Sequence, residues 1–260
     1  MSSYKSPPKL LDELGITEPN EIHIEAIAQY CGALILYERL EGCVARILGN
    51  GNEAIITVDE RSPLERRRFS AAHELGHWMR DREKIRFSCT EQSMQSEWGA
   101  FNTEHAANQY AADLLLPKSM FIPAAKDKPL TLDSAAELGG LFRTSLTATA
   151  IHLLRYGSFP GMLIYTENGK RKWFIRGEDV PDCLWPQDIP MAATYAADLI
   201  KRERQTSSPA AIQADGWISH PRSRWYEVVE HSVRVSRSGI LTMLWWKNER
   251  QLLDLNEDED

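Results

Sequence analysis

Apolar positions in the first quarter of the chain change from a helical to a strand-like period. Residues 21–31 (EIHIEAIAQYC) have the apolar spacing of a helix. Three short β-rich runs follow, GALILYERL, EGCVARIL and NEAIITVDE, which are separated by Glu-Gly and Gly-Asn-Gly-Asn turn signals. The pattern predicts a helix that leads into a small sheet.

The next part of the chain has the pattern of two long helices. Ser62-Pro63 is typical of a helix start, and the following residues 64–81 place one apolar stripe at Phe69, Ala72, Leu75, Gly76 and Met79. A polar stretch over residues 84–99 separates this helix from a second one, EHAANQYAADLLL (residues 104–116), which Pro117 ends. Residues 132–156 predict two further helices joined near Thr144-Ser145.

The pattern changes again beyond Gly157. The segments GMLIYTE, KRKWFIRG, RWYEVVEHSVRVS and GILTMLWWK alternate or run apolar like strands, with MAATYAADLIKRER as a helix among them. We therefore expect an α+β protein with two domains, residues 1–157 and a mixed α/β domain at 158–260. Ser158-Phe159-Pro160 is the expected joint.

The composition is that of an ordinary soluble protein. The 260 residues are 43% hydrophobic and carry a formal net charge of −7, which argues against wholesale electrostatic capture of nucleic acid. The first residues have no signal-peptide core, and no stretch approaches the roughly 18 apolar residues that span a bilayer. We expect no membrane partner and a cytoplasmic location. The four cysteines lack CxxC spacing and make a poor disulfide framework.

The strongest chemical signal is the stretch FSAAHELGHWMRD, residues 69–81. A helix repeats every 3.6 residues, so His73 and His77 project side by side and can hold one ion. Glu74 falls about 100° round the helix from His73, beside such an ion. In this HExxH arrangement two neutral imidazoles bind Zn²⁺ and the carboxylate takes a proton from the activated water. The competing interpretation is a helix surface that happens to carry two histidines.

A catalytic zinc site needs a third protein ligand, which we expect on the second long helix. Glu104 is the best candidate, because it lies near the expected start of that helix, beside its apolar stripe. Asn108, one turn further on the same face, is placed to hydrogen-bond a ligand imidazole. His105 is the competing third ligand, although its neighbours favour a solvent-facing position.

The paired motifs RRRFSAAHELGHW and EHAANQYAADLLLP make residues 20–157 similar to the ImmA/IrrE family of zinc metallopeptidases. The resemblance implies a helical, zincin-like domain with a small sheet, in which His73, His77 and Glu104 bind zinc and Glu74 is the base. It also implies cleavage of helix-turn-helix (XRE-type) repressors after DNA damage or phage signals. His152 departs from the family pattern and is a candidate for stabilising the oxyanion, though a histidine in a late helix is more often structural.

Cys89 lies between the two ligand helices, and its thiolate on the metal would displace the nucleophilic water. A free thiol without a function is the alternative. The chain resembles the CapP branch of the family, which is associated with bacterial anti-phage CBASS operons. The resemblance lies in the motif RRRFSAAHELGHW, in a cysteine twelve residues after His77, and in the size of the C-terminal half. That resemblance implies a cysteine switch that keeps the peptidase latent until a ligand acts.

The same resemblance implies a GAF-like sensor domain in the C-terminal half and a response to single-stranded DNA. Aromatic residues interleaved with basic ones can stack bases and neutralise phosphates. Most tryptophans of this half, Trp245 above all, nevertheless suit a core. The segments KRKW and HPRSRWY are better candidates for an exposed surface, which gives as possible nucleic-acid contacts Lys170, Arg171, Lys172, Arg222 and Arg224.

Two non-enzymatic functions compete with the peptidase. Residues 135–156 resemble a helix-turn-helix in outline, which would make the chain a DNA-binding regulator with a structural zinc. Apart from Arg143 and Arg155, however, the segment offers few donors for base edges. The third possibility is a non-catalytic module that sequesters a repressor.

Overall fold

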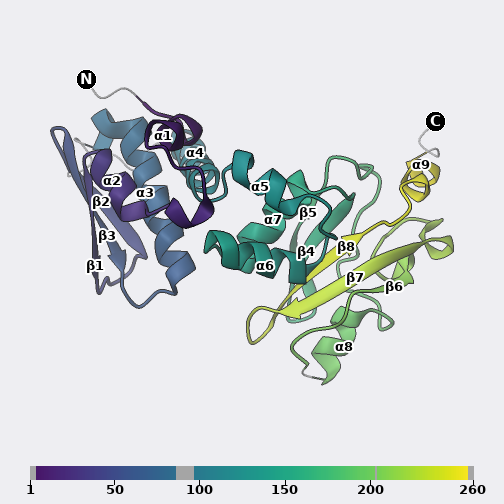
Figure 1. Ribbon diagram of the computed structural model, residues 1–260. Coiled ribbons are helices and arrows are strands. Elements are labelled where there is room, and N and C mark those ends of the chain that lie inside the picture. The colour runs from purple at the N-terminus through teal and green to yellow at the C-terminus, as the bar shows by residue number, and fades with distance from the viewer. Residues whose placement is uncertain (1–3, 86–96, 203, 257–260) are drawn as a thin grey trace. The chain divides into compact units, whose positions relative to one another are not determined.

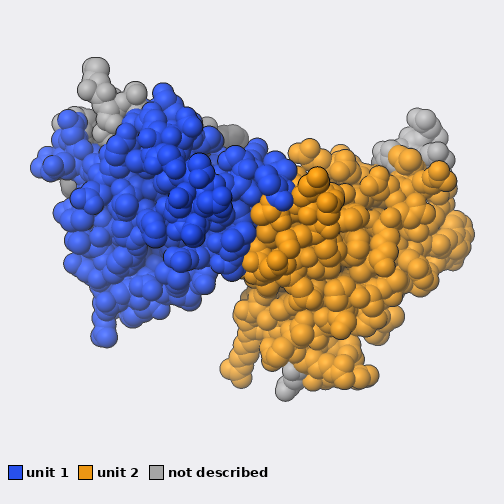
Figure 2. Space-filling model, in the orientation of Figure 1, with its two compact units in different colours: residues 1–123, 139–145 blue, residues 124–138, 146–260 orange. Residues whose placement is uncertain are grey.

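The computed structural model describes residues 4–85, 97–202 and 204–256. The chain forms two compact units (Figure 2). The first unit comprises residues 1–123 and 139–145, and the second comprises residues 124–138 and 146–260.

The first unit packs helices on a small sheet (Figure 1). Its strands β1 (Ala33–Glu38), β2 (Ala45–Asn50) and β3 (Glu53–Asp59) lie in the order β1-β3-β2, with β1 parallel and β2 antiparallel to β3. The helices are α1 (Pro7–Glu13), α2 (Ile24–Tyr30), α3 (Leu64–Ile85) and α4 (Glu97–Leu115), with a 3₁₀ turn at Pro19–Glu21. The long helix α3 contacts all three strands and α4. It therefore lies between the sheet and α4.

The apolar side of α3 holds this unit together. Ala71, Ala72, Leu75 and Trp78 are completely buried in a core that also takes in the inward residues of the sheet and of α4. The indole of Trp78 also donates a hydrogen bond, Nε1 to the Cys31 carbonyl oxygen, at 2.9 Å. The opposite side of α3 carries polar residues, among them His73 and His77.

Gly76 brings α3 and α4 unusually close together. A Cβ added at Gly76 would lie 3.0 Å from the Cβ of Tyr110 and 3.2 Å from the Cα of Ala107. Such distances are tighter than ordinary van der Waals contact, so only glycine lets the helix backbones meet here. The close approach brings the residues of α4 within reach of the histidines on α3.

Replacing Gly76 by Val is expected to lower the free energy of unfolding by about 1–3 kcal/mol, the usual cost of overpacking. Chemical denaturation followed by circular dichroism measures the change. The matched control is Gly140→Val in the helix α6 (Leu132–Phe142), where an added Cβ meets nothing within 4 Å. An equal loss in both variants would show that helix propensity, not the contact with α4, sets the cost.

The second unit is built on one antiparallel sheet of five strands in the order β5-β4-β8-β7-β6. The strands are β4 (Gly161–Glu167), β5 (Lys170–Arg176), β6 (Ala210–Gln213), β7 (Glu227–Arg234) and β8 (Gly239–Trp245). The helix α7 (Leu146–Tyr156) contacts β4, and α8 (Tyr195–Arg202) contacts β7. The other elements of this unit are α9 (Arg250–Asn256) and two 3₁₀ turns, η2 (Ala214–Gly216) and η3 (Ser223–Trp225), whereas most of α5 (Lys118–Ala125) belongs to the first unit.

Two adjacent residues of β7, Glu230 and His231, are completely buried polar groups. The Glu230 carboxylate accepts the backbone N–H groups of Tyr195 and Ala196, at 2.9 and 2.7 Å, and so binds the first turn of α8. His231 Nδ1 accepts the N–H of Leu132 at 3.1 Å, which ties the start of α6 to the sheet. Burial raises the pKa of Glu230 and lowers the pKa of His231, because it disfavours the charged form of each.

The periodicity of the sequence predicts most of these elements correctly. The three early strands, α3, the pair α6 and α7, α8 and the strands β4, β5, β7 and β8 are confirmed, so the chain is a mixed α+β protein. The prediction for α4 is wrong at its start: the helix begins at Glu97, so Glu104 lies two turns inside it. The expected helix over residues 21–31 is shorter and begins at Ile24. The helices α1, α5 and α9 and the short strand β6 were not predicted.

Candidate metal centre and active site

Three of the predicted site residues come together between α3 and α4. His73 Nε2 lies 3.2 Å from Glu104 Oε2, and His77 Nε2 lies 3.1 Å from Glu104 Oε1. The two Nε2 atoms are 3.1 Å apart. One potential ligand atom from each residue therefore lies within 4.8 Å of the others, as chelation of a single ion requires.

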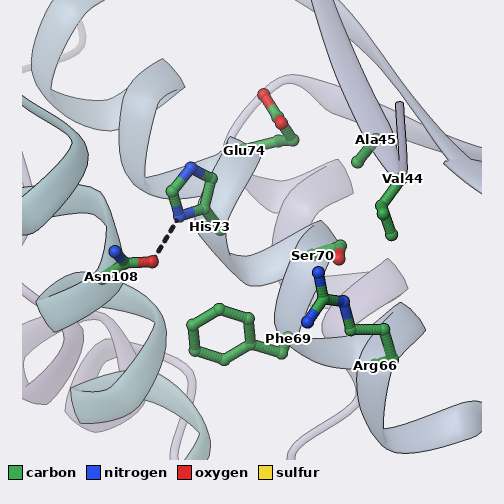
Figure 3. A pocket seen from close by; sticks show the side chains of 8 residues that line it. All are labelled: Val44, Ala45, Arg66, Phe69, Ser70, His73, Glu74 and Asn108. Carbon is green, nitrogen blue, oxygen red and sulfur yellow. Dashed lines mark hydrogen bonds between the residues drawn. The ribbon is translucent and has the colours of Figure 1, made fainter. Parts of the chain in front are cut away.

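Asn108 orients the first of the two imidazoles. His73 Nδ1 and Asn108 Oδ1 are 3.0 Å apart (Figure 3). An amide oxygen only accepts hydrogen bonds, so Nδ1 carries the proton and Nε2 presents its lone pair toward Glu104. A ligand histidine whose other nitrogen donates to an oxygen is the usual supporting arrangement around a bound metal. Asn108 thus lies where the sequence places it.

The chemistry of this donor set fits a zinc ion. Two imidazoles and one carboxylate form one of the three-ligand sets of catalytic zinc sites, which keep a further position open. The side chains of His73 and His77 are each 16% exposed, whereas Glu104 is 58% exposed. The nitrogens are therefore largely shielded from water, and the carboxylate marks the open side of the cluster.

Glu74 is half-buried next to His73. The pKa of Glu74 is raised to about 7. Burial is the larger cause of this shift, and the nearby Glu104 carboxylate is the smaller one. Glu74 lines a cavity of about 370 Å³ together with His73 and Asn108, and Figure 3 shows its side chain above that of His73 in this view. The cavity gives a water molecule and part of a substrate space next to Glu74.

The cavity beside Glu74 has walls from three elements. The described residues that line it are Val44, Ala45, Arg66, Phe69, Ser70, His73, Glu74 and Asn108. The sequence pattern does not assign the first five of these to the site, and it places Phe69 in the apolar stripe of the helix. Arg66 and Ser70 precede Glu74 at intervals of four residues, so helical spacing alone places them on the same side of α3. No comparable signal marks Val44 and Ala45, which the sheet brings to the site from a distant part of the sequence.

His152 lies in α7, and the structure assigns it to the second unit. Its side chain is 3% exposed, and its ring meets the Tyr156 ring edge-on with 4.8 Å between the centroids. His152 thus belongs to a packed helix, and its proposed action on an oxyanion stays a prediction. Cys89 lies outside the described residues, so its binding to the metal also stays a prediction. His105 is exposed and does not join the cluster of His73, His77 and Glu104.

The basic residues of β5 are partly engaged within the chain. Arg171 forms an ion pair with Asp188, and Lys172 Nζ lies 3.6 Å from Glu167 Oε2. Lys170 is exposed. Because neighbouring carboxylates offset two of these three charges, the strand offers less net positive charge to a nucleic acid than the sequence suggests.

The other predicted basic group lies in and just before η3. The Arg224 guanidinium stacks over the Trp225 ring, 5.1 Å from its centroid, and the Trp225 side chain is 63% exposed. The half-buried Arg222 precedes this turn. The turn η3 contacts β6 at one edge of the sheet, whereas β5 forms the opposite edge, so the two basic groups are separate.

The fold and the site together have the layout of an HExxH metallopeptidase domain, with two histidines on one helix and a carboxylate on its neighbour. A comparison with known families agrees, because residues 28–154 match Peptidase_M78, the IrrE N-terminal-like domain. This match supports the assignment to the ImmA/IrrE family. It runs into α7, which the structure groups with the second unit, and the expected domain boundary at residues 157 and 158 stays a prediction.

Among solved structures, a Mycobacterium tuberculosis transcriptional regulator has a similar fold. The TM-score is 0.60 at 15% sequence identity, and the alignment covers 92% of this chain and 85% of that one. At this identity the likeness concerns the fold alone. No curated protein sequence matches the chain. No helix among the described residues is long and apolar enough to cross a membrane.

Proposed function

We propose that the chain is a zinc-dependent endopeptidase that cleaves a helix-turn-helix (XRE-type) transcriptional repressor and thereby relieves repression. The observation that carries this proposal is the convergence of His73, His77 and Glu104 next to the half-buried Glu74 and its cavity. The IrrE N-terminal-like match over residues 28–154 supports the same reaction class. The repressor as substrate rests on the resemblance to the ImmA/IrrE family.

Each residue of the site would have a separate role in peptide hydrolysis. His73, His77 and Glu104 would hold the zinc ion, and Asn108 fixes the tautomer of His73. The bound cation would supply Lewis acidity to the scissile carbonyl and to water. Glu74 lines the cavity, where it is placed to accept a proton from the attacking water and to deliver it to the leaving amine.

The regulatory part of the proposal concerns the second unit and Cys89. We place the chain with the CapP branch that is associated with anti-phage CBASS operons, and we propose that Cys89 on the metal keeps the enzyme latent. A single five-stranded sheet with helices against it is compatible with a GAF-like sensor domain. The exposed Trp225 beside Arg224 supports single-stranded DNA as the activating ligand.

The alternative of a DNA-binding regulator finds less support in the structure. The helix α7 would have to present its side chains to DNA as a recognition helix. Its buried residues are Thr149, Ala150, His152, Leu153 and Leu154. A helix that buries this much of its surface has little left for reading base edges.

Incubation of the zinc-loaded protein with a purified XRE-type repressor encoded nearby tests the proposal. We expect discrete repressor fragments in mass spectrometry, no fragments after treatment with a chelator, and renewed cleavage after zinc is added back. Because latency is part of the proposal, the assay includes the Cys89→Ala variant and a single-stranded oligonucleotide, each expected to raise the rate. A repressor that stays intact in a stable complex with the loaded protein would instead indicate sequestration.

A further inference from the structure

Three consecutive arginines near the start of α3 have different surroundings. The Arg67 guanidinium lies over the Tyr37 ring, 5.3 Å from its centroid. Arg68 is 5% exposed and donates from Nη1 to the Ile22 carbonyl oxygen at 3.1 Å. Both therefore serve the packing of the first unit. Arg66 is exposed and lines the cavity next to Glu74.

The cavity has opposite charges at two places. Among the described residues that line it, Arg66 is the one fixed cation and Glu74 the one carboxylate. Figure 3 shows the Arg66 guanidinium beside Ser70 and apart from the Glu74 carboxylate. The side chains of Val44, Ala45 and Phe69 add apolar surface. This lining suits a side chain with an apolar stem and an anionic end, oriented with its charge toward Arg66.

The spacing along α3 sets how far from the scissile bond this side chain lies. Arg66 precedes His73 by seven residues, which is about 10 Å along a helix axis. An extended peptide advances about 3.3 Å per residue. A substrate residue that reaches Arg66 while the scissile bond lies beside His73 is therefore within about three residues of that bond.

We propose that Arg66 is a specificity-determining residue that selects substrates with an aspartate or glutamate within about three residues of the cleaved bond. The inference rests on the proposed peptidase function and adds its substrate class. Its chemical basis is the guanidinium fork, which donates two parallel hydrogen bonds to one carboxylate. Closure of a bound peptide over the cavity strengthens this pairing, because water is excluded from it.

A library of unstructured synthetic peptides with equal shares of Glu, Gln and Lys tests this selection. Cleavage by the zinc-loaded Cys89→Ala protein is followed by mass spectrometry, and the kcat/KM of matched peptides is compared. We expect the wild-type Arg66 to favour Glu over Gln in this window by about tenfold, which equals about 1.4 kcal/mol. Arg66→Gln is expected to remove the preference, and Arg66→Glu to turn it toward Lys.

The matched control is Arg67→Gln, which removes the same charge one residue further along α3 but away from the cavity. It is expected to keep the preference for Glu. An Arg66→Gln profile identical to that of the parent protein would overturn the inference while leaving the peptidase proposal intact. So would an equal loss of the preference in Arg67→Gln, because it would indicate a general charge effect.

A binding measurement separates failure of the inference from failure of the proposed function. Fluorescence anisotropy with a labelled Glu peptide and its Gln counterpart is measured on the zinc-loaded Cys89→Ala/Glu74→Gln variant, since binding needs no turnover. We expect about tenfold tighter binding of the Glu peptide and no difference once Arg66→Gln is added. Equal affinities in the Arg66 protein overturn the selection. Selective binding without any cleavage by the zinc-loaded Cys89→Ala protein supports Arg66 and contradicts the peptidase.

Discussion

Glu74→Gln is expected to lower kcat for peptide cleavage by about a thousandfold while the protein keeps its zinc. General-base catalysis contributes roughly 10²–10⁴-fold, and an amide of the same shape accepts no proton from water. The three proposed ligands are unchanged, so metal content measured by mass spectrometry is expected to equal that of the parent protein. Because Glu74 is half-buried and its carboxyl group resists ionisation there, removal of the charge is not expected to destabilise the fold.

Glu65→Gln in the first turn of α3 is the control for Glu74→Gln. It removes one carboxylate from the same helix without touching the cavity, and it is expected to leave kcat unchanged. Loss of cleavage with retained binding of the repressor supports the peptidase. Derepression that persists undiminished in Glu74→Gln would support the sequestering module instead, because that function needs no base.

The core of the candidate site could be predicted from the sequence because its determinants are local. The positions of His73, Glu74 and His77 follow from the period of one helix. The chemistry of a catalytic zinc site then requires a third ligand, and the stripe pattern of a second helix favours Glu104 over His105. The structure brings Glu104 to both imidazoles, although α4 begins earlier than the pattern indicates. The start of α4, EWGAFNT, follows a polar stretch and contains Gly99, a weak helix former, so it carries only a weak helical signal.

The cavity could be predicted only in part, since one of its walls comes from a long-range contact. Val44 and Ala45 reach the site through the pairing of β2 with β3, and nothing in their own sequence indicates chemistry. Arg66 shares a helical face with Ser70 and Glu74, so the helical period separates its direction from those of Arg67 and Arg68. The sequence does not show that a cavity lies on this face, nor that Arg67 packs on Tyr37 and Arg68 donates to the Ile22 carbonyl oxygen.

The second unit shows the same limit for buried polar residues. Alternation in RWYEVVEHSVRVS predicts the strand β7, but it does not show that Glu230 and His231 are completely buried. Their partners are backbone N–H groups at the starts of α8 and α6, far away in sequence. Burial of a polar side chain costs free energy unless such hydrogen-bond partners exist. Only the tertiary fold brings these partners to the side chain, so the local sequence does not show them.

Glu104→Ala is expected to abolish zinc binding at the micromolar concentrations of an assay, and cleavage with it. Removal of a partner that only orients a ligand typically costs ten- to a hundredfold in metal affinity. Loss of one of three direct ligands is therefore expected to cost more than about a hundredfold. Glu104 is 58% exposed, so the fold is expected to survive. Competition with a chromophoric chelator measures the affinity, and a thermal melt checks the fold.

His105→Ala is the matched control, because it changes the neighbouring residue and tests the competing ligand at the same time. Adjacent residues on a helix point about 100° apart, so His105 cannot share the direction of Glu104 toward His73 and His77. We expect its zinc affinity to stay within about twofold of the parent value. The reverse result, with zinc lost in His105→Ala and kept in Glu104→Ala, would require α4 to turn by about one residue and would remove the site from which the peptidase is inferred.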